Sequence, residues 1–203
     1  MKLNIATCNP DKLVEIQAVF RIPGLEMGSA LDYPELPEVV EDGETLEANA
    51  VKKAVALAKA TSAWALSDDT GLEVDALGGA PGVYAARYAG ERATYLDNVR
   101  KLLDELDGVA DRRARFRTAI ALSDPQGRTE WVEGEVRGVI TTVARGEGGF
   151  GYDPVFQPDG ATSTFAELPA EEKYSISHRA RALKRALEAW GPRLSALAAN
   201  RGT

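Results

Sequence analysis

The sequence predicts a mixed-sheet α/β domain with a second lobe, and two observations lead to this prediction. In the first third of the chain, short apolar runs typical of strands alternate with segments of helical periodicity. In the middle of the chain, two strand-like runs are separated only by a turn, so a block of strands follows the alternating part. Alternating strands and helices favour a sheet covered by helices, and the added strands favour a mixed sheet.

The composition is that of an ordinary globular protein. The 203 residues are 44% hydrophobic and 27% charged, and the formal net charge is −7. This length favours one domain, or two small lobes that share a sheet. The negative charge argues against nonspecific nucleic-acid binding, and an anionic substrate would need a local cluster of basic residues or a metal.

The sequence also predicts a cytosolic protein. No stretch approaches the ~20 apolar residues of a membrane span, and no long apolar segment follows Lys2 as in a signal peptide. Cys8 is the only cysteine, so no disulfide can form within the chain. We expect Cys8 to be a small buried side chain, because His178 is the only imidazole that could activate it as a thiol nucleophile.

The first third of the chain predicts three strands and two helices. Strands are expected at Leu3–Ala6 and Ala63–Leu66, which are both apolar runs, and around Leu25–Ala30. Asn9-Pro10 is a typical helix start, an N-cap residue followed by proline, and the helix should continue to about Phe20. An apolar face of helical period predicts a second helix over Thr45–Ala60.

The rest of the chain predicts one helix, a hairpin, a further strand and a C-terminal helix. Turn signals at Asp124–Gly127 define the hairpin. The expected elements are a helix at Thr94–Leu106 that starts with a capping box, an antiparallel hairpin of Arg115–Ser123 and Thr129–Val136, a strand at Val139–Val143, and a long helix capped by Ser177. We expect the last helix to break at Gly191-Pro192.

Two adjacent carboxylates, Asp68 and Asp69, follow the apolar run Ala63–Leu66. Carboxylates are costly to bury unless cations meet them. Neighbouring strand residues point to opposite faces, so the two should aim differently unless the strand has already ended. One would then hold a metal and the other a water or a backbone donor. A strand-ending Asx turn is the alternative, because Asp, Thr and Gly all suit turns.

A strand that runs into a helix N-terminus forms an anion site, and Leu3–Ala6 leads into Asn9-Pro10 in this way. Lys12 falls in the first turn of that helix, where the dipole disfavours a cation. A bound phosphate would explain the lysine, and the alternative is a solvated surface side chain.

Several motifs, in the right order, closely resemble those of the inosine triphosphate pyrophosphatase family, the dITP/XTP pyrophosphatases that remove non-standard purine nucleoside triphosphates. The resemblance runs from Leu3 to about Leu183. Its motifs are Thr7-Cys8-Asn9-Pro10-Asp11-Lys12, the stretch from Ser67 to Tyr84, Gly149-Phe150-Gly151-Tyr152-Asp153-Pro154, Glu172-Lys173 and Ser177-His178-Arg179.

The resemblance implies a fold, a reaction and partners. The fold would be a single α/β domain over residues 1–203, with an elongated mixed β-sheet flanked by helices and a nucleotide cleft between two lobes. The reaction would be hydrolysis of ITP, dITP, XTP or dXTP to the nucleoside monophosphate and pyrophosphate. The resemblance further implies Mg²⁺ as cofactor and a homodimer. The net charge and the lack of a long apolar stretch argue against nucleic acid and membrane as partners.

The resemblance also implies roles for individual residues. Asp69 would be the catalytic base or a metal ligand, and the further magnesium ligands would be Glu41 as first choice, then Glu38 and Asp68. The expected substrate-binding residues are Thr7, Cys8, Asn9, Pro10, Asp11, Lys12, Lys53, Thr70, Phe150, Gly151, Tyr152, Asp153, Lys173, His178 and Arg179.

Base selection is expected from Phe150, His178 and Arg179. An aromatic face can stack on a purine, and arginine is a pure donor that suits the 6-oxo group of hypoxanthine or xanthine. The alternatives are core packing for Phe150 and a helix-start hydrogen bond for His178.

Two other functions fit less well. A non-catalytic purine-nucleotide-binding module or sensor would bind without turnover, and the Asp68-Asp69 pair argues against it. A dinucleotide oxidoreductase is disfavoured because no Gly-x-Gly-x-x-Gly follows the first strand.

Overall fold

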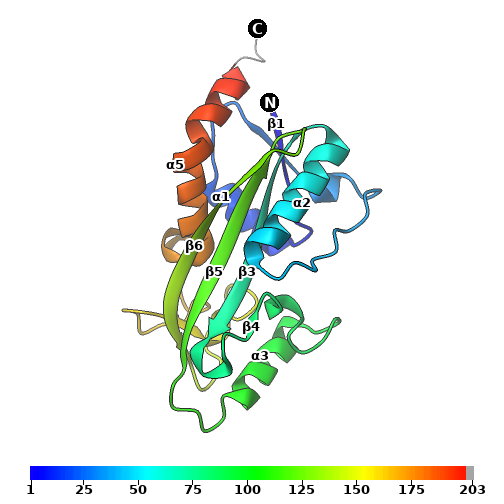
Figure 1. The fold of residues 1–203 in the computed structure, drawn as a ribbon. Helices are drawn as coiled ribbons and strands as arrows, with labels where there is room; N and C mark the ends of the chain where they lie inside the picture. The colour runs from blue at the N-terminus through cyan, green and yellow to red at the C-terminus, as the bar shows by residue number, and fades with distance from the viewer. Residues whose placement is uncertain (200–203) are drawn as a thin grey trace. The chain divides into compact units, whose positions relative to one another are not determined.

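The computed structural model describes residues 1–199, which form the predicted mixed α/β fold (Figure 1). The strands are β1 (Lys2–Ile5), β2 (Glu26–Ser29), β3 (Trp64–Val74), β4 (Pro81–Gly82), β5 (Arg113–Ser123), β6 (Thr129–Ile140) and β7 (Phe156–Pro158). The α-helices are α1 (Pro10–Val19), α2 (Leu46–Thr61), α3 (Tyr95–Glu105), α4 (Ala170–Ile176) and α5 (His178–Ala199). None of the helices in residues 1–199 is both long and apolar enough to cross a membrane.

The sheet is mixed, as the sequence predicts. Its strand order is β2-β1-β3-β5-β6-β7, and β4 pairs with β3. Strand β1 is parallel to both β2 and β3, whereas β4 and β7 are antiparallel to their partners β3 and β6.

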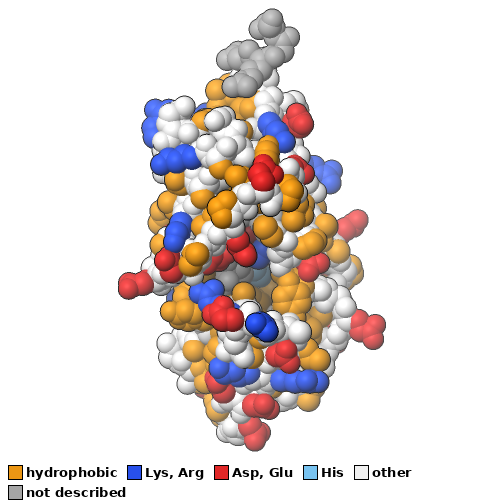
Figure 2. Space-filling model, turned by 90° about the vertical axis from the view of Figure 1, so that its right-hand side faces the viewer, with side chains coloured by type: hydrophobic (Ala, Val, Ile, Leu, Met, Phe, Trp, Pro, Cys, Tyr) orange, Lys and Arg blue, Asp and Glu red, His pale blue; other side chains and the backbone are white. Residues whose placement is uncertain are grey.

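By their internal contacts the residues divide into two compact units. The first unit comprises residues 1–69, 118–134 and the described residues from 179 on, and the second comprises residues 70–117 and 135–178. Each unit has its own hydrophobic core. On the face that Figure 2 shows, acidic and basic side chains are interspersed among apolar ones.

In the first unit, the alternation of side chains along β1 and β3 decides which helices cover which face of the sheet. Ile5 and Leu66 belong to a buried cluster with residues of α1 and α5, such as Ile16 and Trp190. Ala65, the neighbour of Leu66, packs instead with residues of α2. Helices α1 and α5 therefore cover one face and α2 covers the other (Figure 1).

In the second unit, α3 supplies the apolar stripe that its sequence predicts. The stripe includes Val99 and Leu102, and it packs with Leu72 and Val74 of β3 and with aromatic residues such as Phe156. The Thr94–Asp97 capping box is present at the start of this helix, also as predicted. The second unit is thus built around the half of β3 that follows Asp69.

The prediction that the third strand ends before Ser67 is wrong, and so is the alternative of an Asx turn. Strand β3 continues without interruption from Trp64 to Val74. The carboxylates of Asp68 and Asp69 can remain in the strand because basic side chains from the helices neutralise them.

Two further expectations are wrong. No separate strand begins at Val139, because β6 is one strand that runs to Ile140. Helix α5 does not break at Gly191-Pro192 but continues to Ala199 with Pro192 inside it. Gly191 has no Cβ to crowd the proline ring, and Leu194 and Ala198 beyond it are buried, so packing sustains the helix past Pro192. The short helix α4 has no counterpart in the expectations.

Candidate active site

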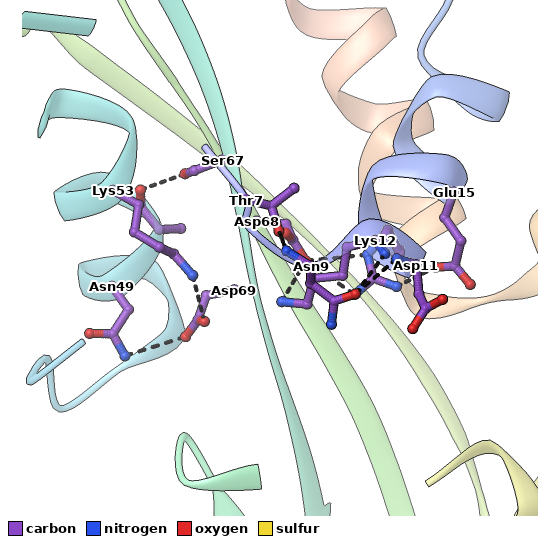
Figure 3. A network of polar contacts seen from close by, with 12 residues as sticks. Thr7, Asn9, Asp11, Lys12, Glu15, Asn49, Lys53, Ser67, Asp68 and Asp69 are labelled. Carbon is purple, nitrogen blue, oxygen red and sulfur yellow. Dashed lines mark hydrogen bonds and ion pairs between the residues drawn. The ribbon is translucent and has the colours of Figure 1, made fainter. Parts of the chain in front are cut away.

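The centre of the candidate site is the middle of β3, where two adjacent carboxylates face opposite sides of the sheet. Asp68 has the parity of Leu66 and faces α1 and α5, whereas Asp69 has the parity of Ala65 and faces α2 (Figure 3). Ser67, also on the α2 side, donates to the backbone carbonyl of Ala50 at 2.5 Å. The prediction that Asp68 and Asp69 aim differently is therefore confirmed.

Asp68 is fully buried between cations. Its Oδ2 lies 3.1 Å from Nζ of Lys12 and accepts hydrogen bonds from Nε and Nη2 of Arg179 at 3.2 and 3.1 Å. Burial alone would raise the pKa of Asp68, but the charges of Lys12 and Arg179 outweigh burial and hold the pKa well below its ordinary value. Asp68 is therefore charged at neutral pH and anchors two basic side chains.

The capped start of α1 positions Lys12. The side chain of Asn9 accepts hydrogen bonds from the backbone N–H groups of Asp11 and Lys12, and Thr7 accepts one from the N–H of Asn9 at 3.1 Å. Lys12 then reaches back to Asp68 with its side chain only 18% exposed. The alternative that Lys12 is a solvated surface lysine is thus wrong, and Asp68 compensates the charge that the helix dipole disfavours.

On the other face of β3, Asp69 lies in a second cluster. Its Oδ1 is 3.0 Å from Nζ of Lys53, and its Oδ2 accepts a hydrogen bond from Nδ2 of Asn49 at 3.3 Å. The same ammonium of Lys53 donates to Oε1 of Glu41 at 3.0 Å. Two carboxylates therefore meet at one buried lysine.

Asp69 is the carboxyl of this cluster whose pKa is raised. Burial is the largest influence on this carboxyl and raises its pKa to about 6, because Lys53 and Lys12 offset only part of the burial and Glu41 adds negative charge. Burial would also raise the pKa of Glu41, but the charge of Lys53 outweighs burial and lowers it. The pKa values of these two neighbouring carboxyls are therefore shifted in opposite directions.

Asn49 connects Asp69 with the loop that carries Glu41. While its Nδ2 donates to Asp69, its Oδ1 accepts a hydrogen bond from the backbone N–H of Gly43 at 2.8 Å. A side chain at Gly43 would meet Oδ1 of Asn49 at 2.6 Å, so a residue without Cβ is needed there. Asn49 thus holds the Asp69 carboxylate directly and fixes the backbone of the loop two residues after Glu41.

Asp69 and Glu41 are the residues best able to hold a divalent metal. Carboxylate oxygens are the ligands that Mg²⁺ prefers, and these two carboxylates already converge on one cation, with 8% and 36% of their side chains exposed. Asp68 is occupied by Lys12 and Arg179, and Glu38 lies exposed in the loop before Glu41. Within residues 1–199, no three His, Cys, Asp or Glu side chains are grouped as metal ligands.

The predicted substrate residues of the second unit gather around Phe150. Lys173 donates to Oδ2 of Asp153 at 2.5 Å, and the same oxygen accepts the backbone N–H of Phe150 at 2.8 Å. The Lys173 ammonium lies 4.7 Å from the centroid of the Phe150 ring. The ring of Tyr95 also lies near Phe150, with the two ring centroids 5.9 Å apart. The ring of Phe150 is therefore only partly buried, and it lies beside the ammonium of Lys173 and the ring of Tyr95.

Two other residues of this unit are buried. The ring of His178 stacks on Phe116, with centroids 4.4 Å apart and planes 17° from parallel. The hydroxyl of Tyr152 donates to the backbone carbonyl of Ala85 at 2.8 Å. Stacking on Phe116 thus holds the imidazole of His178 in place.

The remaining predicted residues lie at the start of α1, in β3 and in the turn that contains Phe150. Pro10 and Asp11 are exposed in the first turn of α1, Thr70 continues β3, and Gly151 has a positive φ of 64°. Cys8 is exposed, so the expectation of a buried cysteine is wrong. The strand ends at Ile5, and Cys8 lies in the turn between β1 and α1.

Sequence reasoning did not single out two residues of the site, Glu15 and Asn49. Buried Glu15 bonds Nη1 of Arg179, and it stands one helical turn after Asp11-Lys12. Asn49 stands one turn before Lys53 on α2. Helical spacing could have identified them. Glu15 lies three residues after Lys12 and Asn49 lies four residues before Lys53, so each shares a helix face with a predicted site lysine.

Comparison with known proteins shows which family this chain resembles. The sequence profile of the Ham1 family matches residues 3–189. The dITP/XTP pyrophosphatase of Desulforamulus reducens is 50% identical over 190 residues, 93% of this chain and 94% of the relative. That of Bacillus subtilis is 47% identical over 183 residues, 89% of this chain and 92% of the relative.

A solved structure shows the same fold. The Ham1 protein of Staphylococcus aureus is 38% identical and superposes with a TM-score of 0.86, over 95% of this chain and 100% of that one. The fold class expected from the sequence, a mixed sheet flanked by helices, is thus confirmed.

Proposed function

Because the chain belongs to the Ham1 family, we propose that it hydrolyses dITP, ITP, XTP and dXTP to the nucleoside monophosphate and pyrophosphate. The observation that carries the proposal is the 50% identity, over nine tenths of the chain, to a protein named dITP/XTP pyrophosphatase. A fold alone does not determine a reaction, so the assignment of roles rests on the clusters around Asp68, Asp69 and Phe150.

We assign the proton-transfer role to Asp69. With a pKa of about 6, this carboxylate is ionised at neutral pH yet basic enough to accept a proton from the attacking water. Attack on the α-phosphate would release pyrophosphate. The negative charge of the substrate is then met by Lys12, Lys53 and Lys173.

We assign a Mg²⁺ ion to Asp69 and Glu41. When bound, the ion would supply positive charge that offsets the phosphate oxygens and favours deprotonation of the attacking water. For this role, Asn49 holds the Asp69 carboxylate through Nδ2 and the loop that carries Glu41 through a bond from the backbone N–H of Gly43 to Oδ1.

The structure changes the role that we propose for Arg179. Its Nε and Nη2 donate to Asp68, its Nη1 bonds Glu15, and the side chain is 2% exposed. The sequence analysis expects the same guanidinium group to donate to the 6-oxo group of the purine. We therefore favour Arg179 as the counter-ion that keeps Asp68 charged beside Lys12, with Phe150 as the residue that stacks on the purine.

We further propose a homodimer in the cytoplasm, with neither nucleic acid nor membrane as a partner. The family resemblance supports the dimer. The net charge of −7 and the single cysteine support the other assignments.

A nucleotide panel tests the proposed function. Purified protein is incubated with ITP, dITP, XTP, ATP and GTP, with and without Mg²⁺, and pyrophosphate and orthophosphate are measured separately. We expect pyrophosphate from ITP, dITP and XTP only when metal is present. Binding of ITP without release of pyrophosphate would instead favour a nucleotide sensor, and orthophosphate as the first product would exclude cleavage at the α-phosphate.

A further inference from the structure

Lys53 is placed like an internal substitute for a metal ion. Its Nζ is 3.0 Å from Oδ1 of Asp69 and 3.0 Å from Oε1 of Glu41, so a single positive charge bridges both carboxylates. Its side chain is only 11% exposed, and α2 directs it toward β3 (Figure 3). A buried lysine between two carboxylates is an ion bridge of the kind that a divalent cation also forms.

We propose that Lys53 and the divalent cation compete for Asp69 and Glu41, so that the ammonium neutralises this pair in the metal-free protein and leaves it when metal binds. This inference rests on the metal-dependent hydrolysis proposed above and adds an order of events to it. An ammonium and a divalent cation repel each other strongly when both contact the same buried carboxylates. Simultaneous occupation of one position by both is therefore excluded.

The carboxylates do not depend on Lys53 alone for their position. Asn49 bonds Asp69 through Nδ2 and the backbone of Gly43 through Oδ1, and it is 1% exposed. Asp69 is also part of the continuous strand β3. When Lys53 leaves, two oxygen ligands remain together, and their uncompensated charge favours uptake of a cation.

The exchange has a consequence for the reaction. In the metal-free protein the charge of Lys53 is used to neutralise Asp69 and Glu41, so the lysine is not available for a phosphate. Once it leaves these carboxylates, its long side chain carries the same charge to another anion. Metal binding and phosphate binding by Lys53 are then coupled events.

The test measures binding of Mn²⁺ alone, without nucleotide, to EDTA-treated full-length protein at neutral pH. Free Mn²⁺ is followed by electron paramagnetic resonance for the wild type and for Lys53→Met. A second variant, Lys53→Gln, keeps a hydrogen-bond donor and guards against a folding defect of the first. Lys52→Met is the matched control, because Lys52 pairs with Asp42 at 2.5 Å, is 43% exposed and changes the net charge equally.

We expect Lys53→Met and Lys53→Gln to bind Mn²⁺ roughly 10- to 100-fold more tightly than the wild type, the equivalent of one charge-assisted hydrogen bond that no longer has to be broken. Lys52→Met should stay near the wild type. Mn²⁺ should also raise the Tm of Lys53→Met more than that of the wild type, because binding to the folded state stabilises it.

Three outcomes would overturn the inference. Wild-type affinity in both Lys53 variants would show that the ammonium does not compete with the metal, while the proposed hydrolysis would stand. An equal gain in Lys52→Met would reduce the effect to net charge. A wild type and variants that all fail to bind Mn²⁺ without nucleotide would overturn the exchange in the metal-free protein, and the nucleotide panel reports separately whether hydrolysis needs metal.

Discussion

At the scale of single residues, the site depends on two neighbouring carboxylates with opposite properties. Asp68 is surrounded by Lys12 and Arg179, and its pKa is held below the ordinary value. Asp69 has a pKa raised to about 6, with burial as the main cause. One residue step along a strand reverses the direction of the side chain, and this places the two carboxylates in different electrostatic surroundings.

Asp69→Asn tests the proposed base. The amide keeps the shape of the carboxylate but can neither accept the proton nor contribute charge, so kcat for ITP should fall by about 10²- to 10⁴-fold. Pyrophosphate release is the measurement, with Asp159→Asn, an exposed aspartate, as the control for loss of one charge. An Asp69→Asn variant within a few-fold of the wild type would contradict the assignment.

Asp68→Asn tests the anchor through the pH dependence of stability. Removing one partner of a buried ion pair typically costs about 3–5 kcal/mol, so the variant should be less stable at neutral pH. The folded pKa of Asp68 is depressed, so its contribution is present above the unfolded value of 3.8 and is lost as pH falls below it toward the folded value.

Urea unfolding of both proteins across pH measures this contribution. The difference in unfolding free energy between wild type and Asp68→Asn should be constant from pH ~8 to ~4 and should shrink at lower pH. A difference that stays constant below pH ~4, or that grows there, would show that the charge of Asp68 is not what stabilises the fold.

At the scale of elements, loops and helix starts place the groups that the strands cannot supply. Asn9 caps α1 and thereby places Lys12, and the Gly149–Asp153 turn places Phe150. In that turn, a Cβ on Gly149 would lie 2.1 Å from Oδ2 of Asp153, and the φ of Gly149 is +68°. Any side chain there would displace the carboxylate that holds both Lys173 and the backbone of Phe150.

Gly149→Ala should therefore both destabilise the protein and raise KM for ITP. A positive φ costs an L-residue about 1–3 kcal/mol, and the clash with Asp153 adds to that. Gly160→Ala is the matched control, because its φ is +81° and nothing lies within 4 Å of the added Cβ. Thermal unfolding and kinetics of both variants separate the cost of the positive φ from the clash with Asp153. Equal losses of Tm and equal changes of KM in the two variants would mean that the clash with Asp153 contributes nothing.

At the scale of the whole molecule, the early alternation of strands and helices was sufficient to predict a mixed sheet covered by helices. The opposite directions of the Asp68 and Asp69 side chains could be predicted from strand geometry alone. The length of β3, which continues to Val74, could not. Two charged residues normally end a strand in the sequence pattern, and only the helices that pack on both faces show why these do not. The C-terminal helix was misjudged for a similar reason, since tertiary packing sustains it past Pro192.

Individual contacts were harder to predict than elements. Motifs placed Lys12, Lys53 and Arg179 in one site, but which carboxylate each would meet depends on distances between elements that are far apart in the chain. Arg179 and Asp68, for example, are 111 residues apart. The purine role suggested for Arg179 came from its donor chemistry, which a buried carboxylate satisfies equally well.

The separate roles proposed for Asp69 and Phe150 lead to a prediction for the molecule as a whole. Asp69 is assigned to proton transfer at the phosphates and Phe150 to the purine, so substitutions at the two should damage different quantities. Phe150→Ala should weaken ITP binding by about 1–3 kcal/mol, the usual contribution of one base stacked on an aromatic ring, and should leave the rate at saturating substrate closer to the wild type. Asp69→Asn should do the reverse.

A binding measurement with the unreactive Asp69→Asn background makes the test sharp. Isothermal titration with ITP compares Asp69→Asn with Asp69→Asn/Phe150→Ala, and the same comparison is made with inosine monophosphate and with pyrophosphate. Loss of stacking should weaken ITP and inosine monophosphate by a similar factor and leave pyrophosphate unaffected, because pyrophosphate has no base. Equal weakening of all three ligands would mean that Phe150 supports the fold around Asp153 and Lys173, and the purine would then need another partner.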